Sequence, residues 1–152
     1  MFVKQICTER SIIITAQASL KEAMRMLIEH RISGLIVTDG HDTVVGMLSE
    51  KDILQRLLPT YAEFMADPVA AMKYKDVAFK IEKAGDMTVG DIMSTPVLTI
   101  GPEEHVMKAC AEMIAHHIRR LPVVEPSTGK LIGIVSMGDV FRGLLTKVQA
   151  AQ

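Results

Sequence analysis

Hydrophobic positions in the second half of the chain follow a fixed order of short runs. The apolar run at 96–100, which a Gly-Pro pair closes, predicts a strand. Between 103 and 117 apolar residues recur at helical spacing and predict an amphipathic helix. The runs 121–124 and 131–135 flank a turn and predict a β-hairpin. A second helix is predicted over 137–148.

The first half of the chain repeats this order. When the sequence is shifted by 86 residues, Val3 falls on Val89 and Ile14 falls on Ile100. One extra residue in the hairpin turn changes the offset to 87, and the match then continues through both predicted second helices. Matches held in one register with a single gap indicate an internal duplication. The corresponding strands and helices of the first copy are predicted at 12–14, 20–29, 35–38, 44–48 and 51–58.

The duplication predicts two domains of the same kind. Repeat 1 covers 1–58 and repeat 2 covers 88–148, and a partly helical linker at 59–87 joins them. A β-α-β-β-α unit with such short strands cannot cover its own sheet, whereas two copies can cover each other. We therefore expect an α+β fold in which the two repeats pack face to face about a pseudo-two-fold axis. It would contain two mixed sheets and four principal helices, two of them facing outward.

Composition and charge exclude several classes of protein. Of the 152 residues, 49% are hydrophobic and 23% are charged, which indicates a globular core. The net charge of −1 argues against nucleic-acid binding, whose affinity depends on neutralising phosphates. We expect no membrane association, because no apolar run is long enough to span a bilayer. No signal peptide is evident, so the expected location is the cytoplasm.

Metal and catalytic chemistry lack a recognisable motif. His116 and His117 are adjacent, so on a helix they point about 100° apart and chelate one ion poorly. Cys7 and Cys110 stand alone and are expected to be reduced thiols. No nucleophile motif, phosphate-binding loop or dinucleotide fingerprint occurs. We therefore expect no metal site, no catalytic cofactor and no enzymatic activity.

The third strand of each repeat ends in the same chemical group, a Ser followed three residues later by an Asp. These pairs are Ser49 with Asp52 and Ser136 with Asp139. The simplest interpretation is a capping box, which satisfies the free N–H groups of a helix start without any ligand. The alternative is a nucleotide site, because a helix N-terminus attracts phosphate and a carboxylate can accept hydrogen bonds from ribose hydroxyls.

The repeat, the Gly-hydrophobic-hydrophobic-Ser-x-x-Asp ending and the lead-in VGDIMSTP at 89–96 resemble the cystathionine-β-synthase-type (CBS) domain family. The resemblance covers nearly the whole chain apart from the linker and the last few residues. It implies clefts between the repeats, where Asp holds ribose, Ser contacts phosphate and the strand before the first helix contacts adenine. Basic residues before the second strand would neutralise phosphates. The residues matching these roles, with two glycines that would allow close approach of a ligand, are Ser136, Asp139, Arg119, Arg120, Thr99, Ile100 and Gly133 in repeat 2, and Ser49, Asp52, Ile13, Ile14 and Gly46 in repeat 1.

The two repeats differ in this pattern. Ser33 and Gly34 stand where repeat 2 has its two arginines, and Ile36 stands where it has Pro122. We therefore expect unequal clefts.

The resemblance implies a regulatory module that binds AMP, ADP or ATP and transmits its ligand state to a partner protein. Two alternatives stay open: a module for NAD(H) or S-adenosylmethionine, and a ligand-free scaffold whose Ser-x-x-Asp pairs are simple helix caps. The family also implies a homodimer formed through the outward helices. The apolar residues expected to form its interface are Leu54, Leu57, Leu58, Phe141, Leu144 and Leu145.

Overall fold

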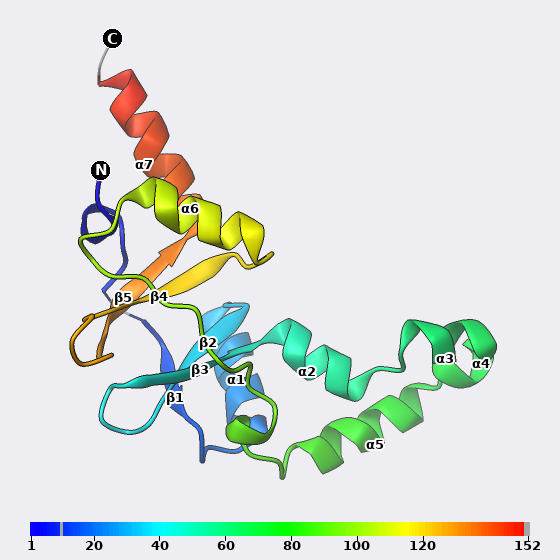
Figure 1. The fold of residues 1–152 in the computed structure, drawn as a ribbon. Coiled ribbons are helices and arrows are strands. Elements are labelled where there is room, and N and C mark those ends of the chain that lie inside the picture. The colour runs from blue at the N-terminus through cyan, green and yellow to red at the C-terminus, as the bar shows by residue number, and fades with distance from the viewer. Residues whose placement is uncertain (10, 151–152) are drawn as a thin grey trace. The chain divides into compact units, whose positions relative to one another are not determined.

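The structure is a computed structural model that describes residues 1–9 and 11–150, with the side chains of all of these except 74 and 75. It has mixed α and β architecture, and the predicted order of elements is complete in the first copy and lacks only the first strand in the second (Figure 1). The first copy consists of β1 (Ile13–Thr15), α1 (Leu20–His30), β2 (Gly34–Thr38), β3 (Val44–Ser49) and α2 (Glu50–Leu57). The second consists of α6 (Val106–Ala115), β4 (Arg120–Val124), β5 (Leu131–Ser136) and α7 (Met137–Gln149). The α+β prediction is confirmed.

The chain divides into two compact units that do not coincide with the two repeats. The C-terminal unit contains Met1–Ile12, Gly40–Val44 and Val97–Gln152. The central unit contains Ile13–Asp39 and Val45–Pro96. The segment at the beginning of each repeat therefore lies in the unit that contains the remainder of the other repeat. We call residues 1–9 the N-terminal lead-in and residues 88–96 the middle lead-in.

The sheet of the C-terminal unit is the hairpin of β4 and β5. The strands are antiparallel, with Arg120 opposite Ser136 and Val123 opposite Gly133. The prediction of a full strand at 96–100 is wrong, because only Ile100 forms a bridge, a parallel one to Val123. Continuing this parallel ladder backwards would need an N–H at position 122, and Pro122 has none.

The core of the C-terminal unit includes the N-terminal lead-in. Val3 is fully buried in it, and the lead-in pairs with β5 through Thr8 N–H to Ile134 O at 2.8 Å and Ile134 N–H to Thr8 O at 2.9 Å. Burial of the apolar side chains of both segments holds the lead-in in place. The buried members of this core are Val3, Ile100, Ala109, Met113, Leu121, Val123, Val135 and Val140.

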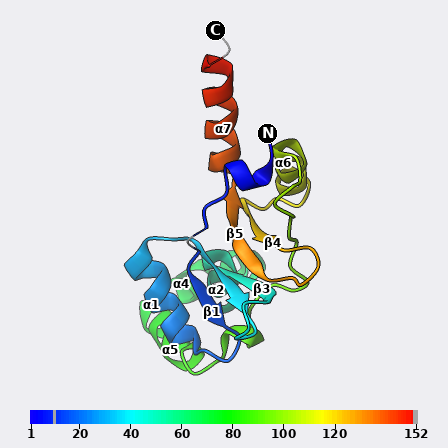
Figure 2. The same ribbon diagram turned by 90° about the vertical axis from the view of Figure 1, so that its left-hand side faces the viewer.

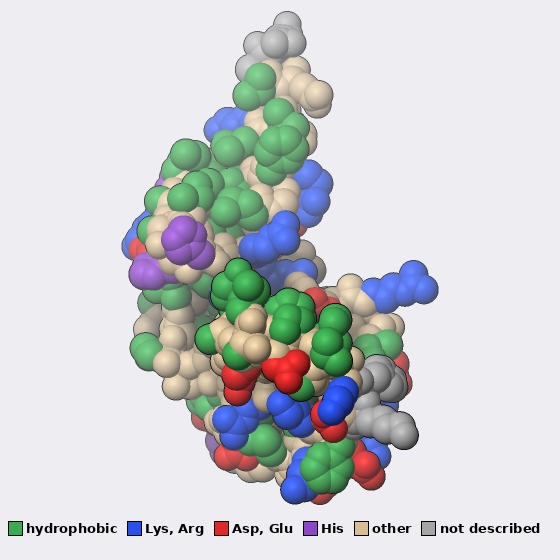
Figure 3. All heavy atoms as spheres, turned by 90° about the vertical axis from the view of Figure 1, so that its right-hand side faces the viewer, with side chains coloured by type: hydrophobic (Ala, Val, Ile, Leu, Met, Phe, Trp, Pro, Cys, Tyr) green, Lys and Arg blue, Asp and Glu red, His purple; other side chains and the backbone are tan. Residues whose placement is uncertain are grey.

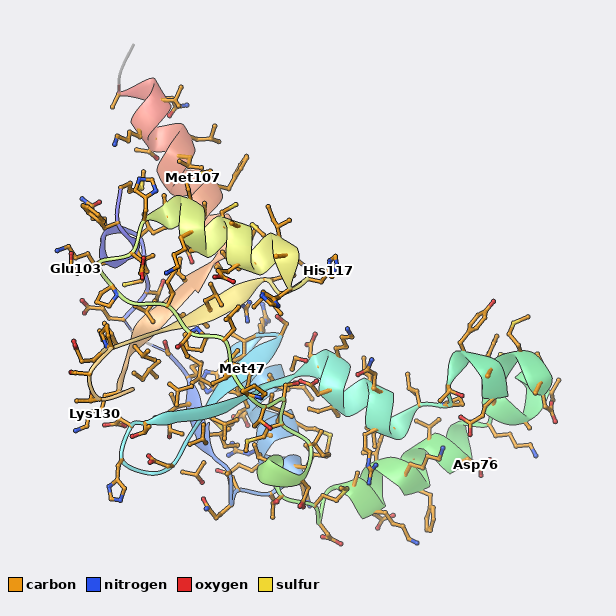
Figure 4. All side chains as sticks on the ribbon, viewed as in Figure 1. Met47, Asp76, Glu103, Met107, His117 and Lys130 are labelled. Atoms are coloured by element: carbon orange, nitrogen blue, oxygen red, sulfur yellow. The ribbon has the colours of Figure 1, made fainter. Side chains whose placement is uncertain are left out.

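The central unit is built in the same way. Its strands lie in the order β1-β2-β3, and β1 runs parallel to β2, where Ile36 keeps the N–H that Pro122 lacks. Ser94 of the middle lead-in pairs with Met47 of β3, which is labelled in Figure 4, by backbone hydrogen bonds of 2.8 and 3.3 Å. Val89, the repeat equivalent of Val3, is fully buried. The exchange of lead-ins thus occurs in both units.

The predicted linker forms three helices, α3 (Tyr61–Ala66), α4 (Pro68–Ala71) and α5 (Tyr74–Ala84), with the short 3-10 helix η2 (Val89–Asp91) after them. The linker is therefore helical over most of its length, in three separate helices. Several apolar side chains of α3 and α4 face solvent, among them Tyr61, Met65 and Val69 (Figure 3).

The outward apolar stripes are present with one exception. Leu54 of α2 and Leu58, which caps the end of α2, are about half exposed. Phe141 and Leu145 of α7 are exposed along a helix that extends away from β5 (Figure 2). The expectation for Leu57 is wrong, because this side chain is buried. Leu57 follows the buried Ile53 by four residues, so both lie on the inward face of α2. Leu144 is 36% exposed, at the edge of the α7 stripe.

No helix within the described part of the chain is long and apolar enough to cross a bilayer.

Candidate functional site

The junction of β3 and α2 carries the first candidate pair. Ser49 ends β3 in extended conformation, and its hydroxyl oxygen accepts a hydrogen bond from Asp52 N–H at 3.2 Å. In return, Asp52 Oδ2 accepts from the Ser49 N–H and from its hydroxyl, both at 2.7 Å. This is a complete capping box, so the carboxylate folds back onto the backbone of its own helix start.

The junction of β5 and α7 repeats this geometry. Ser136 accepts from Asp139 N–H at 3.2 Å, and Asp139 Oδ2 accepts from Ser136 N–H at 2.8 Å. The Ser136 hydroxyl also donates to Oδ2. The capping role that the sequence left open is therefore realised in both repeats.

The second oxygen of each carboxylate points away from the cap and has a different partner in each repeat. Asp52 Oδ1 accepts from the Ser94 hydroxyl at 3.1 Å. Asp139 Oδ1 forms an ion pair with Arg142, with Nη2 at 2.6 Å. Neither partner was expected from the sequence. The spacing of three between Asp139 and Arg142 was a usable signal, since such residues face each other on a helix. Ser94 offered none, because it lies 42 residues from Asp52.

The surroundings of Asp139 shift its pKa. Partial burial raises the pKa of Asp139, but hydrogen bonds from the Ser136 side chain and backbone and from Arg142 outweigh it. The net pKa therefore lies below its usual value, because these groups favour the ionised form.

This shift predicts a loss of stability in acid. A carboxylate with a depressed folded-state pKa stabilises the fold above its unfolded value of about 3.9, and the contribution disappears as the pH falls through the folded pKa. We expect the free energy of unfolding of the wild type to fall more steeply below about pH 4 than that of Asp139→Asn, which lacks the titrating group. Urea denaturation at pH 7, 5, 4 and 3 measures this. Parallel curves for the two proteins would contradict it.

The two glycines of the motif are explained by the lead-ins. A Cβ at Gly133 would lie 2.5 Å from Thr8 O, and one at Gly46 would lie 2.6 Å from Met93 Sδ. The atoms that lie close to these two glycines therefore belong to the protein's own lead-ins. The ligand-facing role expected for Gly46 and Gly133 stays a prediction.

The two arginines of repeat 2 lie at the start of α7. Arg120 is the β4 partner of Ser136, and Arg119 O accepts a hydrogen bond from Met137 N–H at 3.0 Å. The equivalent bond in repeat 1 joins Glu50 N–H to Ser33 O, also at 3.0 Å. The structure thus brings the arginines and the Ser136–Asp139 pair to one edge of the C-terminal unit.

The four residues expected to contact adenine fall into two classes. Ile14 and Ile100 are buried at 5% and 4% exposure, so their side chains belong to the cores. Ile13 is 38% exposed and Thr99 is half-buried, which leaves these two side chains accessible. All candidate residues of repeat 1 lie in the central unit and all those of repeat 2 lie in the C-terminal unit.

A hollow of about 260 Å³ lies beside Asp52. Its lining comes from α2 and η2 of the central unit and is largely polar. Asp91 in this lining has a pKa below its usual value, first because the Thr88 N–H donates to it and to a smaller degree because Arg56 is nearby. The lining residues are Asp52, Gln55, Arg56, Asp91 and Ile92.

Comparison with known proteins identifies the family. The model of the CBS domain matches residues 3–59 and 89–146, which is more than half of the chain. The chain belongs to the CBS domain family. Its two matches agree with the duplication seen in the sequence, and they leave most of the linker outside the family domain.

Two relatives match this chain along most of their own length. The uncharacterized protein MJ1426 of Methanocaldococcus jannaschii is 29% identical, over 95% of this chain and 92% of its own. The crystal structure of CBSX2 from Arabidopsis thaliana is 28% identical with a TM-score of 0.81, covering 97% of this chain and 96% of that one.

Two solved structures contain ligands. CBSX2 in complex with AMP is 28% identical with a TM-score of 0.73, covering 95% of this chain and 96% of that chain. The CBS domain pair of MJ0100, in complex with 5′-methylthioadenosine and S-adenosyl-L-methionine, is 26% identical with a TM-score of 0.69, covering 97% and 98%. The curated CBSX2 protein is chloroplastic, and this chain spans 58% of its length. A cytoplasmic location for the present chain stays a prediction.

Proposed function

We propose that this protein is a non-enzymatic regulatory module that binds adenine nucleotides and passes its ligand state to a partner protein. The observation that carries the proposal is the pair of Ser-x-x-Asp helix starts, in a chain whose fold matches that of the AMP complex of CBSX2 along nearly its whole length. A ligand of this kind alters a partner only through different affinities for two arrangements of the protein.

The capping boxes are compatible with ribose recognition. Each uses Oδ2 of its carboxylate, while Oδ1 faces away from the helix start and accepts one hydrogen bond within the described part of the chain. A carboxylate oxygen has two lone pairs, so Oδ1 can accept a ribose hydroxyl in addition. The positive end of the helix and the neighbouring Ser hydroxyl favour a phosphate at the same place.

A thermal-shift series with Asp52→Ala and Asp139→Ala tests the proposal. A nucleotide at 100 times its dissociation constant should add about 2.7 kcal/mol to the stability of the wild type. We expect Asp139→Ala to remove more of this gain than Asp52→Ala, because the arginines lie beside Asp139. Each variant is compared with itself without ligand, which separates the loss of the cap from the loss of binding. A wild type that AMP, ADP and ATP all fail to stabilise would refute the proposal.

Two other functions are each favoured by one observation. The MJ0100 complexes favour a ligand such as S-adenosylmethionine, and NAD(H) shares the same adenosine portion. Including both in the thermal-shift series separates them from the nucleotides. The complete capping boxes favour a ligand-free scaffold, for which no adenosine compound would raise the melting temperature.

The same proposal includes a homodimer formed through the outward helices. The exposed apolar side chains Leu54, Leu58, Phe141 and Leu145 support it, because such stripes are stabilised when a partner covers them. Sedimentation of the wild type measures the oligomeric state.

A further inference from the structure

Arg142 is the only group in the described structure that forms an ion pair with a candidate ribose-binding carboxylate. Its Nη2 lies 2.6 Å from Asp139 Oδ1, the oxygen that the capping box leaves available. The Arg142 side chain is 71% exposed, whereas that of Asp139 is 16% exposed. The carboxylate therefore holds one end of a guanidinium whose other donors face solvent.

Gly138, in the first turn of α7, leaves space for this guanidinium. Gly138 precedes Asp139, and a Cβ at Gly138 would lie 3.2 Å from Arg142 Nη1. This is tighter than most side-chain contacts, so a residue larger than Gly would require the exposed guanidinium to shift by a few tenths of an ångström. The ion pair with Asp139 holds the guanidinium beside the first turn of α7, where the positive end of the helix disfavours a cation and favours an anion.

Repeat 1 lacks this arrangement. With the repeat offset of 87, Gln55 stands at the position of Arg142 and Lys51 at that of Gly138. The free oxygen of Asp52 accepts instead from the neutral hydroxyl of Ser94. Although α2 carries Lys51 and Arg56, neither forms an ion pair with Asp52 in the described part of the chain.

We infer that Arg142 is a phosphate-recognition residue, and that the Ser136–Asp139 half-site therefore prefers phosphate-bearing adenine nucleotides over adenosine compounds without a phosphate. This inference rests on the proposed function and deepens it. A guanidinium has five N–H donors, and the ion pair with Asp139 uses one of them. The remaining donors form a fork that matches phosphate oxygens.

The electrostatics of the half-site agree with this preference. The backbone of Arg119 bonds to α7, and Arg120 is paired with Ser136, so three arginines lie at or near this helix start. Their counterparts in repeat 1, Ser33, Gly34 and Gln55, are all uncharged. A phosphate bound beside α7 would neutralise cations, whereas the sulfonium of S-adenosylmethionine would add a positive charge to them.

Titration calorimetry with AMP and adenosine tests the inference. The wild type is measured first, and R142Q is then compared with its parent in the D52A background, where the half-site of repeat 2 remains intact. We expect R142Q to weaken AMP binding by about tenfold or more, the effect of losing a charge-assisted contact, with adenosine binding nearly unchanged. The change installs the glutamine that repeat 1 carries at Gln55.

R25Q is the matched control. Arg25 also forms an exposed ion pair within one helix, with Glu29 at 2.9 Å, but it lies on α1. We expect R25Q to leave the ratio of AMP to adenosine affinity unchanged. R142K, which keeps the charge but loses the fork, should fall between the wild type and R142Q.

The possible outcomes distinguish a failure of this inference from a failure of the proposed function. Equal weakening of AMP and adenosine in R142Q would assign Arg142 a structural role and overturn the inference, as would unchanged AMP binding. In both cases the wild type still binds AMP, so the proposed function stands. A wild type that binds neither compound would overturn both.

Discussion

Val3→Asp is expected to destabilise the protein by about 3–5 kcal/mol, because it places an uncompensated carboxylate in a fully buried apolar position. Val3 belongs to the N-terminal lead-in yet lies in the core formed by repeat 2. The substitution therefore tests whether the lead-in is part of that core. Loss on this scale is a large share of the stability of a typical domain.

Urea denaturation measures the loss, and amide hydrogen exchange locates it. Ile134 N–H donates to Thr8 O at 2.9 Å, so its protection should fall when the lead-in detaches. Phe2→Asp is the matched control, because Phe2 is the preceding residue and is 45% exposed. Val89→Asp should cost a similar amount in the central unit. Equal tolerance of Val3→Asp and Phe2→Asp would show that the lead-in lies elsewhere.

Gly133→Ala should lower the free energy of unfolding by about 1–3 kcal/mol, the usual cost of overpacking. The added Cβ would meet backbone, with Thr8 O at 2.5 Å and Thr8 C at 3.1 Å, so relief requires the lead-in itself to move. Gly46→Ala is the matched comparison at the equivalent position of repeat 1. There the nearest atom is the side-chain sulfur of Met93, which can rotate away.

We therefore expect Gly46→Ala to cost clearly less than Gly133→Ala. Thermal unfolding of both variants beside the wild type gives the comparison. Equal costs, or a larger cost for Gly46→Ala, would mean that the lead-ins are not held as the structure places them.

The sequence predicted the elements whose formation is decided by neighbouring residues. The helices α1, α2, α6 and α7 follow the spacing of apolar residues, and the hairpin β4–β5 follows from two strands joined by a short turn. The Ser-x-x-Asp pairs were located for the same reason, because a capping box is a local structure.

Features that depend on distant parts of the chain could not be predicted in this way. The strand at 96–100 fails through Pro122, a residue of its would-be partner strand. The buried state of Leu57 depends on which face of α2 is covered. Ser94 reaches Asp52 only because the middle lead-in packs on the central unit. A repeat reveals that two segments are alike, but not which copy of the body each lead-in joins.

Because the lead-ins are exchanged, the C-terminal unit cannot fold completely until the second repeat has been synthesised. Residues 1–9 leave the ribosome well before β5, the strand that they pair with, which begins only at Leu131. Until then Val3 has no core to enter, and the nascent chain carries this apolar segment unpaired. Such long-range closure slows folding and exposes surface that a chaperone can recognise. A C-terminal half expressed without residues 1–9 would lack both the segment that pairs with β5 and the Val3 side chain of its core.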